Sequence, residues 1–308
     1  MPLLPGAPEI DTGRARRPEL PVRYFQVQLA NDFYQKTDRY YTGGGLLQYA
    51  APGLARGPVH RLLPSLPGAP RQTHGVETVL DVFTPASIGI TEVQRGDRPY
   101  AGYWYAGQFR QSEQPGRGAA LRTALHVGVL GPPAAAGRVQ TAIHRLIDCD
   151  VPAGWGNQVH TDLVLDYQAQ YRKRLWSVAR VLEAGGLAEA RLGTLYDQLR
   201  AGATLRVGPW HPRLRPARRS RRSFWCYGSW QGQLTGVGYN ATLQGGMFNR
   251  SSPYTLRPGR VSRLVPGQTA GVVAGWGKVG IAFGQTWLGR EFSGGKSHCW
   301  NYLSVRLE

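Results

Sequence analysis

The residues best suited to chemistry in this chain include two aspartates, Asp32 and Asp38, in the segment NDFYQKTDRYYTGG. Carboxylate oxygens are the ligands that hard cations such as calcium select. Further carboxylates stand in two later polar segments: Asp97, Asp148 and Asp150. Their number permits a calcium site. For any one of them the alternative is a carboxylate that caps a turn or a helix.

A histidine, His144, is the candidate general base, because the ordinary pKa of an imidazole lies near neutrality. The alternative is a surface histidine without a catalytic role. The chain contains no G-x-S-x-G motif, so a nucleophile-elbow hydrolase is not indicated. A base together with a metal ion fits direct attack of water on an ester.

His144 lies in PPAAAGRVQTAIHRLIDC (132–149), which interrupts an otherwise strand-like sequence. Proline suits a first helical turn, and the apolar residues that follow have helical spacing. These apolar residues are Val139, Ile143, Leu146 and Ile147. Gln140, His144 and Asp148 fall on an adjacent polar side. The segment predicts one helix, and we expect it to pack on the surface formed by the strands.

Alternating polar and apolar residues dominate the rest of the chain. In RYFQVQLAN (23–31), Phe25, Val27 and Leu29 share one face. Eleven further segments have a similar pattern, near 43–51, 74–84, 100–110, 119–130, 161–171, 178–190, 199–207, 224–240, 259–276, 279–289 and 297–307. The sequence therefore predicts twelve strands and an all-β fold.

Polar and apolar residues alternate along the strands of a membrane barrel and of a soluble sheet alike. Strand length and the position of the aromatic residues are therefore what distinguish the two. The segments run to about ten residues, and tyrosine and tryptophan cluster near their ends, as at Tyr40, Tyr41 and Trp104. We therefore predict a twelve-stranded antiparallel transmembrane β-barrel with one short helix in an extracellular loop. A soluble all-β domain is the alternative.

The composition narrows the class further. The 308 residues carry a formal net charge of +18, which suits nucleic acid, an anionic membrane or a phosphorylated ligand. The arginines are spread along the chain, so we expect no nucleic-acid groove; a soluble nucleic-acid-binding protein is a lesser alternative. Three widely spaced cysteines indicate neither zinc nor a disulfide framework. No apolar run is long enough for a transmembrane helix.

The first 22 residues lack the apolar core and cleavage site of a signal peptide. We predict that 1–22 is an N-terminal extension, either disordered or the product of a misplaced start codon, and that 23–308 forms the barrel. With the first strand running outward, the loops near 32–42, 85–98 and 131–160 fall on one rim. These loops are densely polar, and such convergence on a rigid scaffold is how a site forms.

Four blocks, in this order, resemble the bacterial lipid A 3'-O-deacylases, the LpxR-like proteins: NDFYQKTDRYYTGG, RGDRPYAGYWYAG, HVGVLGP with VQTAIHRLI, and PAGWGNQ. The resemblance is carried mainly by residues 23–165. It implies a twelve-stranded barrel in the bacterial outer membrane that removes the 3'-linked acyloxyacyl chain of lipid A, requires Ca²⁺ and acts as a monomer. It also implies lipid A, or lipopolysaccharide, as the partner.

Residue by residue, the resemblance assigns Asn31 and Asp32 to calcium, Thr42 to support of the site and His144 to activation of water. Asp150 stands where a relative has glutamate, as a metal ligand or as the residue that orients His144. Arg95 or Arg98 would replace a basic residue at a lipid A phosphate, or would stabilise the turn. These departures leave a non-catalytic or degenerate barrel of the same fold as the alternative.

Overall fold

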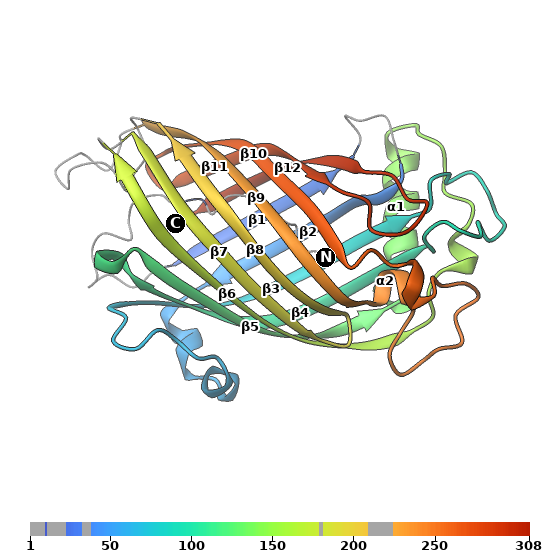
Figure 1. The fold of residues 1–308 in the computed structure, drawn as a ribbon, viewed down its shortest axis with the longest axis horizontal. Coiled ribbons are helices and arrows are strands. Elements are labelled where there is room, and N and C mark those ends of the chain that lie inside the picture. Colours follow the sequence, from blue (N-terminus) through green and yellow to red (C-terminus); the bar gives the residue numbers. More distant parts are fainter. Residues whose placement is uncertain (1–9, 11–22, 33–37, 179–180, 209–223) are drawn as a thin grey trace.

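Twelve antiparallel strands form a closed barrel in the computed structural model of the chain (Figure 1). Each strand pairs with its neighbours in sequence, and the first strand pairs with the last, from Phe25 opposite Leu307 to Asn31 opposite Asn301. The structure describes residues 10, 23–32, 38–178, 181–208 and 224–308. Closure leaves no strand edge unpaired, which is what a sheet that meets lipid requires.

The prediction of twelve antiparallel strands is confirmed. The strands are β1 (Tyr24–Asn31), β2 (Tyr40–Ala50), β3 (Arg71–Thr84), β4 (Ala101–Gln114), β5 (Ala119–Leu130), β6 (Asp162–Val178), β7 (Leu182–Gly193), β8 (Tyr196–Val207), β9 (Phe224–Asn240), β10 (Leu264–Trp276), β11 (Val279–Leu288) and β12 (His298–Leu307). Strand β2 begins three residues before the predicted 43, so Thr42 lies in a strand and not in a loop.

The predicted helix is α1 (Ala136–Leu146), preceded by a short 3-10 turn at Pro132–Ala134. A second helix, α2 (Ala241–Gln244), was not predicted. Its four residues are too few to show a helical period. The side chain of Asn240 caps α2 by accepting from the amide of Thr242 at 3.0 Å. Two further 3-10 turns, Pro52–Arg56 and Pro58–Leu62, follow β2.

The inward faces of the strands carry polar and aromatic side chains, and these largely occupy the lumen. Glu77 on β3 accepts from Arg122 at 2.6 Å and pairs with His126 at 2.8 Å, all three within the barrel. Farther round, Asp166 pairs with Arg191 at 2.7 Å. Buried charges are tolerated when they are paired in this way.

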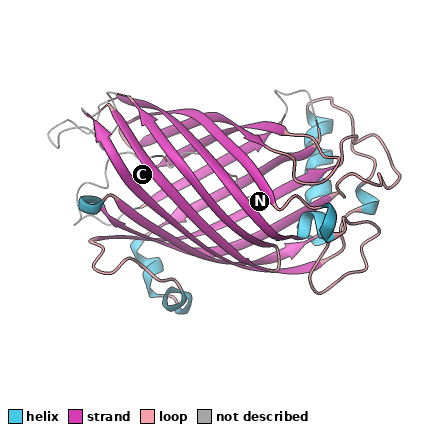
Figure 2. Cartoon of the chain, viewed as in Figure 1, coloured by secondary structure: helices cyan, strands magenta, loops and turns pink. Residues whose placement is uncertain are grey.

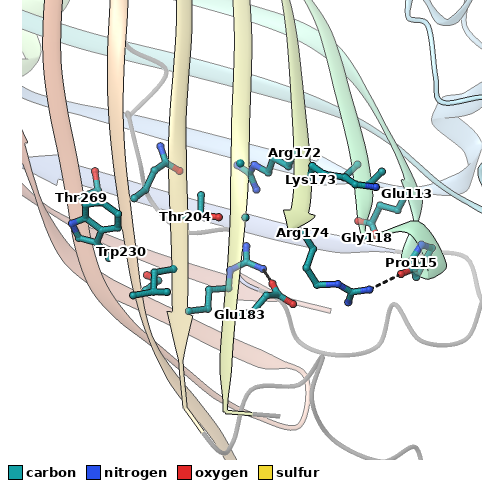
Figure 3. Close-up of a pocket in the computed structure, with 18 of the residues that line it drawn as sticks. Glu113, Pro115, Gly118, Arg172, Lys173, Arg174, Glu183, Thr204, Trp230 and Thr269 are labelled. Carbon is teal, nitrogen blue, oxygen red and sulfur yellow. Dashed lines mark hydrogen bonds and ion pairs between the residues drawn. The ribbon is translucent and has the colours of Figure 1, made fainter. Parts of the chain in front are cut away.

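A cavity of about 180 Å³ lies in the lumen, and Figure 3 shows the side chains that line it. Pro115 and Gly118, in the turn between β4 and β5, are at its edge, so the cavity is at the end of the barrel away from α1. Arg172 and Thr204 line it beside Glu183, which accepts from Arg206 at 3.2 Å. Arg174 closes one side by donating to the carbonyl of Pro115 at 3.2 Å. The cavity contains none of the residues predicted to do chemistry.

The outward faces are apolar, with Leu29, Trp104 and Val127 among many exposed large side chains. No helix in the described part of the chain is long and apolar enough to cross a membrane. All three cysteines are free. Exposed apolar side chains in alternation around a closed barrel are the signature of a sheet surrounded by lipid.

The two ends of the barrel differ. One end, the α1 rim, carries α1, α2, the loops at 85–100 and 131–161, and the described residues between β1 and β2, which are Asp32, Asp38 and Arg39 (Figure 2). The predicted convergence of these three loops on one rim is confirmed by the strand order. The prediction for residues 1–22 lies outside the described residues except at Ile10, which is buried and accepts from Arg306 at 3.1 Å through its carbonyl.

Candidate functional site

Helix α1 lies against the outer wall of the barrel and not over its opening. Gly102 on β4 faces outward, in phase with the exposed Trp104, and a Cβ at Gly102 would stand 2.1 Å from the Cβ of Ala136. Val82 and Thr84 also face outward, yet both are buried, since α1 contacts β3 as well as β4. A glycine on the wall therefore lets the helix backbone approach closely.

The face that α1 presents to the wall is its polar one. Ala136, Gln140 and His144 are the buried residues of the helix. The apolar ridge, defined as Val139, Ile143, Leu146 and Ile147, is exposed, and Leu146 is 85% exposed. The expectation that the helix packs on the strands is confirmed, and the side that packs there is the polar one. A helix beside a membrane barrel has lipid as its apolar neighbour, so its polar side can turn toward the protein.

His144 is held in a defined tautomer. Its Nδ1 lies 2.6 Å from the carbonyl oxygen of Asp150. Because a carbonyl only accepts, Nδ1 carries a hydrogen, so in the neutral form of the ring the lone pair is on Nε2. Nε2 lies 3.5 Å from Oδ1 of Asp38. The ring is therefore oriented from one side and faces a carboxylate on the other.

Asp38 is the carboxylate partner that the structure gives to His144. Burial raises the pKa of Asp38 above its ordinary value; the charge of His144 opposes this shift, and that of Asp150 adds to it. Thr84 fixes the backbone by donating to the carbonyl of Asp38 at 3.0 Å. The sequence had placed Asp38 only among candidate calcium ligands, because its distance from His144 along the chain hides the contact.

The contact between Asp150 and His144 differs from the one expected. Its carbonyl, and not its carboxylate, orients His144, and its side chain is exposed. The carboxylate is still close enough to act on the pKa of Asp38. Replacement of glutamate by aspartate at this position therefore leaves the hydrogen bond to His144 unchanged.

Asn31, Asp32 and Thr42 lie together where β1 meets β2. Asn31 donates through its side chain to the carbonyl of Thr42 at 3.0 Å, and the hydroxyl of Thr42 donates to the carbonyl of Val82 at 3.3 Å. Thr42 sits at a β-bulge, where the register shifts between Tyr41 and Gly43. Bulges commonly redirect a side chain near a functional site.

The 32–39 loop joins this group to His144. Asp32, which is almost fully buried, accepts at Oδ2 from the amide of Arg39 at 3.2 Å. The preceding residue, Asp38, faces His144. Two consecutive residues thus contact the two halves of the predicted site, since Arg39 contacts Asp32 and Asp38 faces His144. With Asn31 and Thr42 they form one connected group of residues between α1 and the outer wall, which we call the crevice.

Gln140 stands one turn before His144 on the buried face of α1. The indole of Trp155 donates to its Oε1 at 2.9 Å. Its Nε2 is buried and has no hydrogen-bond partner among the described residues. The helical spacing of Gln140 and His144 was visible in the sequence, but the partner that orients the amide comes from a separate turn.

The site offers oxygen ligands for a hard cation. Among the described residues, no three His, Cys, Asp or Glu side chains group as they would around a metal ion. Asp32 and Asp38 nevertheless supply carboxylates, and Asn31 an amide oxygen. Calcium accepts amide and backbone carbonyl oxygens beside carboxylates, so this donor chemistry fits calcium better than zinc.

The two arginines considered as phosphate ligands, Arg95 and Arg98, differ in burial. Arg98 is fully buried; it pairs with Glu291 at 3.1 Å and donates to the hydroxyl of Thr242 at 2.9 Å. These contacts tie together three loops of the α1 rim, so the structure supports the structural alternative for Arg98 and not a phosphate contact. Arg95 is exposed, and its role at a phosphate stays a prediction.

A closed twelve-stranded barrel with an apolar outer wall, and with a loop helix whose polar side packs on that wall, defines an integral membrane β-barrel of the outer-membrane class. The family model described as "Outer membrane protein LpxR" matches residues 12–308. The chain belongs to this family, and the resemblance drawn from the four sequence blocks is confirmed.

Among solved structures, LpxR from Salmonella typhimurium is similar to the chain with a TM-score of 0.73 and 18% identity, over 92% of this chain and 99% of that one. At this identity the likeness supports the fold alone. The β domain of the Bordetella autotransporter BrkA is far less similar, with a TM-score of 0.43, 11% identity and coverage of 93% and 98%. No curated protein matches the sequence.

Proposed function

We propose that the chain is a calcium-dependent esterase that removes the 3'-linked acyloxyacyl chain of lipid A in the outer leaflet. The observation that carries the proposal is the position of His144. Its ring is fixed through Nδ1 by the carbonyl of Asp150, and it lies in a crevice on the outer wall of the barrel, where a lipid substrate would be found.

In the proposed reaction, Nε2 of His144 accepts a proton from a water molecule as that water attacks the ester carbonyl carbon. The resulting imidazolium then donates the proton to the departing sugar oxygen, so the fatty acid and the alcohol leave with protons balanced. Asp38, 3.5 Å away, stabilises the imidazolium electrostatically. No covalent intermediate is needed.

In the proposed reaction, hydrogen-bond donors that are fixed before the reaction stabilise the negative charge that develops on the carbonyl oxygen of the ester. The amide Nε2 of Gln140 is buried and donates no hydrogen bond to any described residue. A fixed donor directed at developing negative charge often makes a large contribution to catalysis. Calcium, when bound, would supply positive charge near the same oxygen. Asp32, Asn31 and Asp38 would hold the ion, with Asp150 adding negative charge at the edge.

The surroundings of the crevice favour an anionic lipid as substrate. The apolar ridge of α1 borders it on the outside, and Arg138 and Arg145, also exposed, lie on the other side of the same helix. An apolar side next to a cationic side matches acyl chains next to phosphate groups. Lipid A combines both, as expected for the substrate of this family.

Replacement of His144 by alanine tests the proposal. We expect the release of 3-acyloxyacyl fatty acid from purified lipid A to fall by about 10²–10⁴-fold, the usual contribution of a general base. Thr141→Ala, at a half-buried position of the same helix, serves as the matched control for folding and expression. The readout is lipid A mass spectrometry with calcium and with a chelator.

Unchanged acylation of lipid A with the intact protein would overturn the proposal and favour the non-catalytic barrel. Activity that persists in His144→Ala would overturn the role of the histidine. Activity that a chelator leaves untouched would remove calcium from the proposal.

A further inference from the structure

The segment 51–67, between β2 and β3, folds back onto the outer wall of the barrel. Its backbone carbonyls accept from Arg110 at 2.9 Å through Leu63, and from Thr123 at 3.0 Å through Pro64. The amide of Leu66 donates to Ser112 at 2.9 Å. These side chains face outward, in phase with the exposed Trp104 and Val127. The segment therefore covers part of the surface that would otherwise face lipid.

The residues on the outer face of β4 explain why the 51–67 segment covers this part of the wall. Outward residues are apolar or small near the α1 rim, as at Trp104 and Ala106, and become polar toward the other end. The polar ones are Gln108, Arg110, Ser112 and Gln114. Exposed to hydrocarbon, these groups would be unfavourable. The 51–67 segment satisfies several of them and so marks the level at which the hydrocarbon layer ends.

An apolar groove of about 520 Å³ lies at this level, where the segment meets the wall. Val59 of the segment lines one side, and residues of five strands, most of them facing outward, line the rest. Those that the argument uses are Phe25, Leu47, Val76, Ala106 and Val127. Phe25, Leu47 and Val127 are exposed. The groove is continuous with the lipid-facing wall, so a hydrocarbon chain is its natural occupant.

The charge of the segment indicates which lipid. Between 51 and 70 the chain contains Arg56, His60 and Arg61 and no acidic residue. Both arginines are exposed. Glu113, near this end of β4, faces the lumen and pairs there with Arg71 at 3.9 Å. Cationic side chains at the level of the headgroups attract anionic lipids.

The end of the barrel opposite the α1 rim is the periplasmic one, since the α1 rim carries most of the longer loops. We propose that the groove and the 51–67 segment form a binding site for an anionic phospholipid of the periplasmic leaflet. One acyl chain lies in the groove between Val59 and the wall, and the phosphate lies at Arg56 and Arg61. The site is separate from the crevice under α1 and does not depend on the proposed hydrolysis.

Native mass spectrometry of the purified full chain tests this inference, with dioleoyl phosphatidylglycerol and dioleoyl phosphatidylcholine as probes. We expect one phosphatidylglycerol to be retained per barrel, at least about threefold more than phosphatidylcholine, which corresponds to ~0.7 kcal/mol. Ala106→Trp fills the groove and should reduce the retention of both lipids. The double variant Arg56→Gln/Arg61→Gln should abolish the preference and leave folding intact.

Matched controls lie elsewhere on the molecule. Ala201→Trp adds the same bulk to an exposed outward position of β8, and Arg250→Gln/Arg257→Gln removes two exposed arginines from the α1 rim. Both should retain lipid as the unaltered protein does. The inference is overturned if the unaltered protein shows no preference for phosphatidylglycerol, or if the groove and arginine variants retain lipid as their controls do.

Discussion

At the scale of single residues, the site depends on which atom of a residue is used. The sequence comparison raises the question of whether aspartate can replace glutamate at position 150. In the structure the atom that orients His144 is the carbonyl of Asp150, which every residue type possesses. The carboxylate that faces the ring belongs to Asp38. The hydrogen bond that orients His144 is therefore insensitive to the length of the side chain at position 150.

Asp150→Ala and Asp38→Asn should consequently differ in effect. We expect Asp150→Ala to keep the rate of fatty acid release within about tenfold of the unaltered protein, because the hydrogen bond to Nδ1 survives. Asp38→Asn should lower the rate of fatty acid release at least about tenfold more than Asp150→Ala does, since the imidazolium of His144 loses its counter-charge. Initial rates on lipid A in detergent micelles measure both. An Asp150→Ala variant as inactive as His144→Ala would show that the carboxylate is what matters.

At the scale of elements, the position of α1 depends on a single glycine of the wall. A leucine at Gly102 would collide with Ala136, whose Cβ lies 2.1 Å from the position of a Cβ on residue 102. The helix would have to move away from β4 and take His144 with it. The barrel has no such dependence, because the hydrogen bonds of β4 to β3 and β5 use the backbone.

We therefore expect Gly102→Leu to lower the rate of fatty acid release by about 10²-fold, the effect of a misplacement near 1 Å, while the barrel stays folded. Gly228→Leu is the control, because residue 228 also faces outward and its nearest neighbour would be 3.7 Å from the new Cβ. Rates and the heat-dependent gel shift of the folded barrel are compared. Full activity in Gly102→Leu would contradict the seating of α1 on the wall.

At the scale of the whole molecule, the bilayer takes the place of a hydrophobic core for α1. Val139, Ile143, Leu146 and Ile147 are exposed beside the buried polar side of α1, and α1 runs across the end of the barrel, at a large angle to the strands (Figure 1). A helix with this arrangement lies in the plane of the membrane interface, with its apolar side toward the acyl chains. Under the proposed function, the ridge would hold His144 at the level of the lipid substrate.

The double variant Ile143→Asn/Leu146→Asn should separate membrane seating from chemistry. Full burial of each side chain contributes about 1.5–3 kcal/mol, so partial immersion of two of them should change activity on lipid A in bilayer vesicles by about tenfold or more. On lipid A dispersed in detergent micelles, the rate should stay unchanged, since His144 and Gln140 lie on the other face. An equal loss in both assays would show that the ridge supports the fold of the site instead.

The sequence by itself determined the number of strands, the presence and extent of α1, and the rim on which the polar loops meet. These follow from local periodicity and from the parity of an antiparallel chain, which neighbouring residues encode. It also identified His144, Asn31, Asp32 and Thr42 through the resemblance. The closed tertiary structure decided which face of α1 is buried, that Asp38 faces His144, that Arg98 is internal, and that the 51–67 segment lies on the outer wall.

The physical reason is that these last features join residues far apart in the chain and depend on what surrounds the protein. A periodic pattern shows that α1 has an apolar side, but the solvent decides where that side points. In water it would pack against the protein; beside a membrane barrel the apolar medium is outside. Register, closure and the surrounding bilayer therefore placed the polar face of α1, with His144, against the wall.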